Sequence, residues 1–282
     1  MTVTLMGVAL AFSSRGALAM DDSSIRTAVD AWLSNPAAAE ATYGHISTWE
    51  TGGVTDMASL FSWKSSFNED IGAWDTSGVT DMYAMFWGAS SFDRDIGGWA
   101  VHSVTSMDSM FESAKSFNQD IGDWAVDSVM KTKDMFRWTD AFNQDISGWA
   151  IDSITDMRWM FFGASAFNQD IGDWAVDSVT TMRKMFEGAS AFDQDLGWCV
   201  ADDVDLTDAF TNTPCASTSC GVSVKGVSCA LPTPSPTQTF APTLRPTPQP
   251  TFPQPTPKPT PRRKACAFAP VGWHEIAGAV DR

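Results

Sequence analysis

An internal repeat of 25 residues constrains the fold of this chain more than any other feature of its sequence. Tryptophan recurs at this step, and phenylalanine does so at two other positions of the unit, one of them running from Phe67 to Phe192. The tryptophan column contains Trp74, Trp99, Trp124, Trp149 and Trp174, and the other phenylalanine column contains Phe86, Phe111, Phe136, Phe161 and Phe186. Repetition explains why the 282 residues include 13 Trp and 18 Phe but only 2 Tyr. Self-similarity at such a period predicts a stacked repeat architecture.

Each unit divides into two halves with different patterns. In residues 79–90 the apolar positions fall on one face of a short helix, with Thr80 and Asp81 placed to cap its start and Gly88 suited to its end. Residues 91–99 favour a short strand followed by a turn. Such a unit cannot bury its apolar face alone and must stack on its neighbours. We therefore expect a leucine-rich-repeat-like solenoid of about six units over residues 49–210, with a short helix and a short strand in each coil.

The N-terminal flank carries two further signals. An apolar stretch from Leu5 to Phe12 precedes the small-residue pattern at 17–19, which is typical of a signal peptide over residues 1–19. Residues 20–48 follow as a capping region. Within it, residues 23–35 place their apolar side chains on one helical face, and Pro36 ends that helix. We expect this helix to cover the otherwise exposed end of the first coil.

The C-terminal flank changes composition twice. Cys199, Cys215, Cys220 and Cys229 lie where the repeat decays, and they predict two disulfides in a cap over residues 211–230, with three pairings open. A zinc site is the rival interpretation, which the absence of a CxxC pair disfavours. Residues 231–263 are rich in Pro and Thr and predict a disordered stalk. Residues 264–282, with Cys266, read as the start of a short, truncated module.

A column of aspartates is the candidate metal site. It contains Asp70, Asp95, Asp120, Asp145, Asp170 and Asp195. Stacked carboxylates repel one another, so each needs a hydrogen-bond donor or a cation. The structural interpretation is that each aspartate accepts backbone N–H bonds from the following glycine-containing turn. The functional alternative is calcium bound between coils, although the GGxGxD pattern of calcium-binding repeats is absent.

A neighbouring column invites a second pair of interpretations. It contains Asn68, Asn118, Asn143 and Asn168, with Asp93 and Asp193 at the same position. We expect a buried hydrogen-bond ladder along it, like the asparagine ladder of leucine-rich repeats. A column of ligand contacts is the alternative.

The phrase VTDMxxMFxGASxFNQDIxxW, nearly complete at 79–99, 104–124 and 154–174, resembles the bacterial surface-protein 26-residue repeat, a relative of the BspA-like leucine-rich-repeat surface proteins. The resemblance covers roughly residues 49–210. It implies a secreted or cell-surface protein associated with adhesion and with host or matrix contact. The unit here is 25 residues long, and the Pro/Thr tract is not part of that repeat family.

Charge and site chemistry restrict the function. With 18 Lys and Arg against 34 Asp and Glu, the formal net charge is −16, which disfavours nucleic acids and anionic membrane surfaces as partners. No apolar run is long enough to span a bilayer. Neither the three histidines nor any carboxylate pair departs from the repeat in a way that suggests catalysis, so we expect no catalytic residue and no cofactor.

The function expected from the sequence is that of a non-catalytic interaction or adhesion module, secreted or at the cell surface, that binds a protein or a glycan. The alternatives are a structural spacer and a calcium-stabilised scaffold of a cell covering. An exposed row of Trp or Phe on one face would favour the interaction module, because clustered surface aromatics mark binding sites. A uniformly buried set would favour the spacer.

Overall fold

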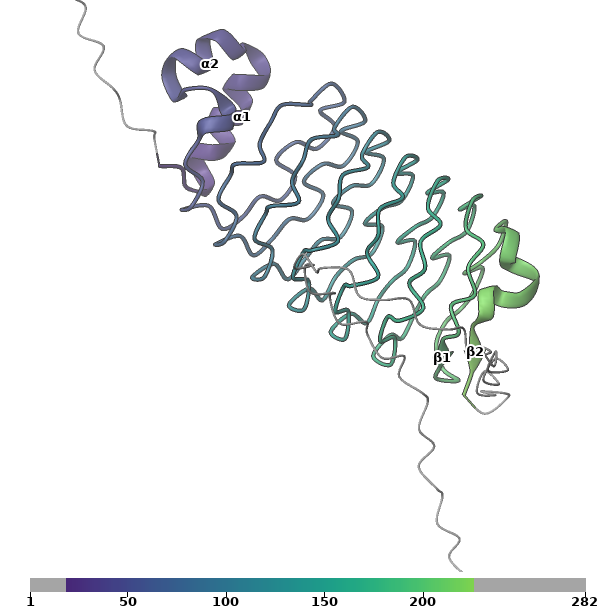
Figure 1. Ribbon diagram of the computed structural model, residues 1–282. Coiled ribbons are helices and arrows are strands. Elements are labelled where there is room, and N and C mark those ends of the chain that lie inside the picture. Colours follow the sequence, from purple (N-terminus) through teal and green to yellow (C-terminus); the bar gives the residue numbers. More distant parts are fainter. Residues whose placement is uncertain (1–18, 226–282) are drawn as a thin grey trace, which may run out of the picture.

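The computed structural model describes residues 19–225, and its regular elements lie at the two ends of that range (Figure 1). At one end are helices α1 (Asp22–Ser34) and α2 (Pro36–Tyr43) and the 3₁₀ helix η1 (Ile46–Thr48). At the other are the 3₁₀ helix η2 (Pro214–Gly221) and strands β1 (Cys199–Val200) and β2 (Ser223–Val224), which pair in parallel. The expected stalk, the terminal module, Cys229 and all but the last residue of the expected signal peptide lie outside the described residues.

Between these ends the chain forms a row of coils that lie side by side (Figure 1). Parallel bridges join equivalent positions of seven successive coils, at Asp56, Asp81, Ser106, Lys131, Asp156, Thr181 and Asp205. Backbone N–H groups of one coil donate to carbonyls of the next, as from Met57 to Asp81 at 3.0 Å and from Phe61 to Met85 at 2.9 Å. The repeat period is therefore the length of one coil, and each coil is bonded mainly to its neighbours.

The coils are built from turns. Between residues 49 and 198 the structure has neither a helix nor a strand, in contrast to the expected short helix and short strand in each unit. In the predicted helical segment, Leu60 N–H donates to the Met57 carbonyl and Lys64 N–H to the Phe61 carbonyl, three residues back, which closes successive turns. Two positions per coil have positive φ, beginning with Ser59 and Trp63, both at 59°. This left-handed conformation interrupts a helix after each turn.

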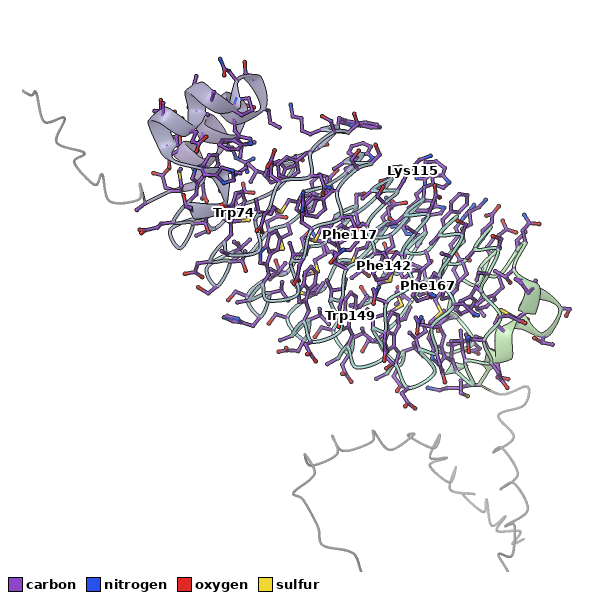
Figure 2. All side chains as sticks on the ribbon, turned by 45° about the horizontal axis from the view of Figure 1, so that its top comes forward. Trp74, Lys115, Phe117, Phe142, Trp149 and Phe167 are labelled. Atoms are coloured by element: carbon purple, nitrogen blue, oxygen red, sulfur yellow. A yellow bond between two sulfur atoms is a disulfide. The ribbon has the colours of Figure 1, made fainter. Side chains whose placement is uncertain are left out.

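The aromatic columns form the core of the array. Neighbouring rings in the column from Phe61 to Phe186 stack with centroids 5.3–5.7 Å apart. The second column, in which Figure 2 labels Phe117, Phe142 and Phe167, runs beside it at a step of 5.8–6.0 Å. The five predicted core tryptophans are at most 4% exposed, and each indole N–H donates to a carbonyl of the preceding coil. All ten predicted core residues are buried.

Replacing Thr132 by Met is expected to raise the free energy of unfolding by about 1–3 kcal/mol, because a buried hydroxyl without a partner carries a desolvation cost of that order. Thr132 is 1% exposed and its hydroxyl has no hydrogen-bond partner. The same position holds a buried methionine in five other coils, for example Met157. Denaturant unfolding of T132M and of the reverse variant M157T would measure the effect. Equal stability of T132M and the parent would contradict it.

Helix α1 lies over the first coil, and Pro36 does not only follow it but begins a second helix, α2, that was not expected. The carboxylate of Asp21 accepts N–H bonds from Ser23 and Ser24 at the start of α1. The helix buries Ile25, Ala28, Val29 and Trp32 against the core. Arg26 donates to the carbonyls of Ala58 at 2.8 Å and Asp56 at 3.3 Å. These carbonyls lie at the edge of the first coil, so α1 provides the partners that a preceding coil would otherwise supply.

At the other end the repeat loses its register. Trp198 follows Trp174 by 24 residues, and its buried indole N–H has no hydrogen-bond partner. After it, η2 closes the end of the array and contains a disulfide between Cys215 and Cys220. Cys199 is also disulfide-bonded. The predicted cap therefore has one of its pairings defined, and Cys229 and Cys266 lie outside the described residues.

Candidate functional site

One surface of the array differs from coil to coil, and we name it the ladder strip. It consists of residues 56–63, 81–88, 106–113, 131–138, 156–163, 181–188 and 205–212, which carry the hydrogen bonds between coils. In the first coil Met57, Leu60 and Phe61 point into the core. The side chains at positions 58, 59, 62 and 63 lie on the outer side. The inward positions repeat and the outward ones do not.

The outward residues of the ladder strip vary in size and charge. The position of Ala58 holds Tyr83, Asp108, Lys133, Arg158, Arg183 and Thr207 in successive coils, and the position of Ser62 holds Trp87, Glu112, Arg137, Phe162, Glu187 and Thr211. The corner formed by FNQDI segments keeps nearly the same residues throughout. The packing of the core does not dictate the outward residues, so they are free to differ from coil to coil.

Among residues 19–225, the most exposed aromatic side chains lie on this strip. Trp63 is 66% exposed, Tyr83 44% and Trp138 42%. The Trp63 ring lies 5.0 Å from that of Trp87, and the Trp138 ring lies 5.8 Å from that of Phe162. Trp63 and Trp138 also have positive φ, 59° and 53°, a conformation that costs a non-glycine residue about 1–2 kcal/mol. Sequence reasoning missed these residues because it followed what repeats; the positions that break the repeat were the available signal.

A charged cluster adjoins Trp138 in the middle of the strip. Nη1 of Arg137 lies 3.3 Å from Oδ1 of Asp134 and 3.6 Å from Oε1 of Glu112. Its guanidinium lies 4.0 Å from the centre of the Trp138 ring, within the range of a cation–π contact. Burial raises the pKa of both Glu112 and Asp134. The Asp134 charge also raises the pKa of Glu112, whereas the Arg137 guanidinium lowers the pKa of both carboxyl groups. The cluster therefore holds partly buried charge of both signs.

Replacing Glu112 by Gln is expected to raise the free energy of unfolding at neutral pH. Burial first, and then the Asp134 charge, keep the pKa of Glu112 above the ordinary 4.5, although Ser109, Arg137 and Lys133 oppose this. The folded chain thus holds this proton more tightly than the unfolded chain, so ionisation of Glu112 destabilises the fold above its folded pKa. The gain should vanish below pH 4.5. Urea unfolding at both pH values would show it; a less stable E112Q at neutral pH would mean that the Arg137 ion pair dominates.

The aspartate column lies on a different corner of the coils, where its carboxylates accept backbone N–H groups and stabilise the turns. Oδ1 of Asp95 accepts the N–H of Gly97 at 3.0 Å, and four further members bond the residue two positions on in the same way. A Cβ at Gly97 would lie 2.6 Å from the carbonyl oxygen of Asp120 in the next coil, which explains glycine there. These bonds match the structural interpretation of the column. In residues 19–225 no three His, Cys, Asp or Glu side chains gather closely enough to hold a metal ion.

The asparagine column forms the expected ladder between coils. Oδ1 of Asn118 accepts the N–H of Asn143 at 2.9 Å, and Oδ1 of Asp93 accepts the N–H of Asn118 at 3.0 Å. The glutamine that follows adds a bond to the preceding coil, as from Gln144 Nε2 to the Asn118 carbonyl at 2.7 Å. The ladder is half-buried or exposed, and not buried as expected, because it lies at the outer corner of each coil.

Replacing Asn118 by Ala is expected to lower the free energy of unfolding by about 1 kcal/mol, the usual value of one partly exposed hydrogen bond. The variant removes the side-chain acceptor of the Asn143 N–H. Asn118→Asp is the matched control and should stay close to the parent, because Asp93 fills the same role one coil earlier. Denaturant unfolding of the two variants decides this. Equal losses in both would show that the amide group itself, and not the acceptor oxygen, supports the ladder.

Constant core columns and a variable outer strip define a repeat protein assembled from stacked, turn-built coils. In the described residues no helix is long and apolar enough to cross a membrane. The chain belongs to the family described as "Mycoplasma protein of unknown function, DUF285", whose model matches residues 33–143 and again 119–220. No curated protein and no solved structure matches the chain.

Proposed function

We propose that this protein is a non-catalytic interaction module, secreted or displayed at the cell surface, that binds a protein or glycan partner through the ladder strip. In this proposal the array is a leucine-rich-repeat-like solenoid, related to the BspA-like surface proteins. The observation that carries it is the exposure of Trp63 and Trp138 on the one surface that the core leaves free to vary.

Two further properties of the strip support this function. Its outward residues include the types that dominate the energy of binding interfaces, namely Trp, Tyr and Arg. It carries charges of both signs, as in Glu112, Arg137 and Glu187 at one position of different coils, which suits specific recognition better than general electrostatic attraction. A structural spacer without a ligand would have no use for exposed tryptophans in an unfavourable backbone conformation.

The test compares one charge on each of two surfaces. Arg183 is exposed on the ladder strip, and Arg94 is exposed on the FNQDI corner, where it donates to the Asn68 carbonyl. The full-length protein is screened on arrays of matrix proteins and surface glycans, and each hit is repeated with the single variants R183A and R94A. Binding that is lost only in the strip variant supports the proposal. Binding lost only in R94A would place the binding surface on the FNQDI corner and contradict the ladder strip, whereas no binding at all would favour the spacer.

A further inference from the structure

We propose that Trp63 and Trp138 form two equivalent platforms for one neutral, extended polysaccharide that runs along the ladder strip. The inference rests on the proposed function of the strip and specifies the chemical class of its ligand.

The two tryptophans share two contacts although they lie in different coils, and Trp138 has in addition the Arg137 guanidinium over its ring. Each lies against the glycine that occupies the same position in the next coil. A Cβ at Gly88 would lie 2.7 Å from Cε3 of Trp63, and one at Gly163 would lie 2.5 Å from Cδ1 of Trp138. Each is also beside an aromatic residue of that coil, Trp87 or Phe162. An indole supported in this way presents a rigid, flat surface to solvent.

Neither tryptophan is explained by the fold. In the other coils this position holds residues that tolerate positive φ or are small, namely Gly88, Ser113, Gly163, Gly188 and Asn212. Tryptophan there adopts an unfavourable backbone conformation and leaves a large apolar surface in water. Its side chain adds nothing to the buried columns. Such an outlier, found twice in the same form, points to a role in binding.

The spacing of the platforms indicates a ligand that itself repeats. The two tryptophans are separated by three coil steps, or about 14 Å on the usual spacing between paired strands. Between them the same position holds only Gly88 and Ser113, so no bulky side chain interrupts the line. A polysaccharide offers flat C–H faces of its sugar rings at a fixed interval along an extended chain. A folded protein would have to place two flat apolar faces on this line by coincidence.

Charge restricts the polysaccharide to a neutral one. The formal net charge of the chain is −16, which repels polymers of uronic acids or sulfated sugars. The cation that contacts Trp138 is already paired, because Arg137 lies 3.6 Å from Glu112 and 3.3 Å from Asp134. Hydroxyl groups of neutral sugars can bond to these paired groups without requiring a free charge.

The test replaces each tryptophan by the residue that other coils have at this position. Full-length W63G, W138G and W63G/W138G are compared with the parent by calorimetry with cellohexaose, laminarihexaose and the corresponding disaccharides. M130T is the matched control, because Met130 is 52% exposed but lies just outside the strip, where other coils have threonine. Thermal unfolding of each variant reports on structure.

The parent is expected to bind a hexasaccharide at least tenfold more tightly than its disaccharide, because only the longer chain reaches both platforms. Each single variant should bind the hexasaccharide about as weakly as the disaccharide, and M130T should bind like the parent. The thermal stability of the glycine variants should equal or exceed that of the parent, because glycine adopts positive φ without strain. Unchanged binding in W63G/W138G, a preference for heparin or polygalacturonate, or a clear loss of stability in the glycine variants would each overturn the inference. A protein hit on the arrays that needs Arg183, with no polysaccharide bound, would overturn the inference and leave the proposed function intact.

Discussion

Deleting residues 104–128 is expected to yield a folded protein with one coil fewer. The cut joins residue 103 to residue 129 and leaves Trp99 followed by Trp149 with all columns in register. Met82 and Phe86 would donate to the carbonyls of Lys131 and Met135, which now accept from Met107 and Phe111. Each coil contacts mainly its neighbours, so the loss is limited to one unit and one interface.

Deleting only residues 104–115 should instead prevent folding. This cut removes the ladder segment of one coil and keeps its remaining corner. Four N–H donors in 82–88 then lose their acceptors, and four carbonyls in 131–137 lose their donors. Phe86 also loses the ring of Phe111, which stacks on it at 5.7 Å. Circular dichroism and limited proteolysis of the two deletions measure the outcome. If both deletions fold, or if neither does, the chain is not an array in which each 25-residue coil is one structural unit.

Replacing Phe161 by Ala is expected to cost about 3–5 kcal/mol of unfolding free energy, the usual range for a buried phenylalanine. Phe161 is fully buried, with the rings of Phe136, Phe167 and Phe186 at 5.5, 4.1 and 5.3 Å. The cavity would disturb the interfaces with both adjacent coils, because the ring belongs to a continuous stack. We expect a marked fall in the midpoint of denaturant unfolding.

The adjacent residue provides the control for this prediction. Phe162 is half-buried on the ladder strip and contacts Trp138 and Arg137. Phe162→Ala removes the same side chain one position further on and should lower stability by less than about 1 kcal/mol, as for most surface substitutions. Similar losses in the two variants would mean that the strip contributes to the core, and the distinction between inward columns and outward strip would be wrong.

The period, the core columns and the two caps could be predicted from the sequence because each depends on residue type alone. Trp74 and Phe86 are found by their spacing, and the apolar face of residues 23–35 indicates a cap without any knowledge of its contacts. The local backbone could not be predicted in the same way. Successive turns send Met57, Leu60 and Phe61 inward, and this i, i+3, i+4 pattern is also that of a helix. The positive φ of Ser59 distinguishes these turns from a helix, and a serine in the sequence does not indicate a positive φ.

The candidate site was harder to predict for a related reason. A repeat directs attention to residues that recur, such as the aspartate column, which the structure uses to close turns. The residues that we assign to binding are those that interrupt the pattern. Trp63 and Trp138 lie outside the 25-residue tryptophan column, but that position alone does not say whether their side chains are exposed or buried. Their assignment required knowing which positions of the turn face outward.

The contact between Arg26 and the first coil bears on how long such a protein can become. Coils joined by backbone bonds have complementary edges, so in principle another chain could add at either end and produce a filament. Arg26 occupies the carbonyls of Asp56 and Ala58 on the leading edge, and the Asp22 carboxylate accepts the N–H groups of Thr55 and Asp56. Helix α1 therefore blocks the backbone groups to which another coil would bond. This limits self-assembly through that edge and keeps the array within one molecule.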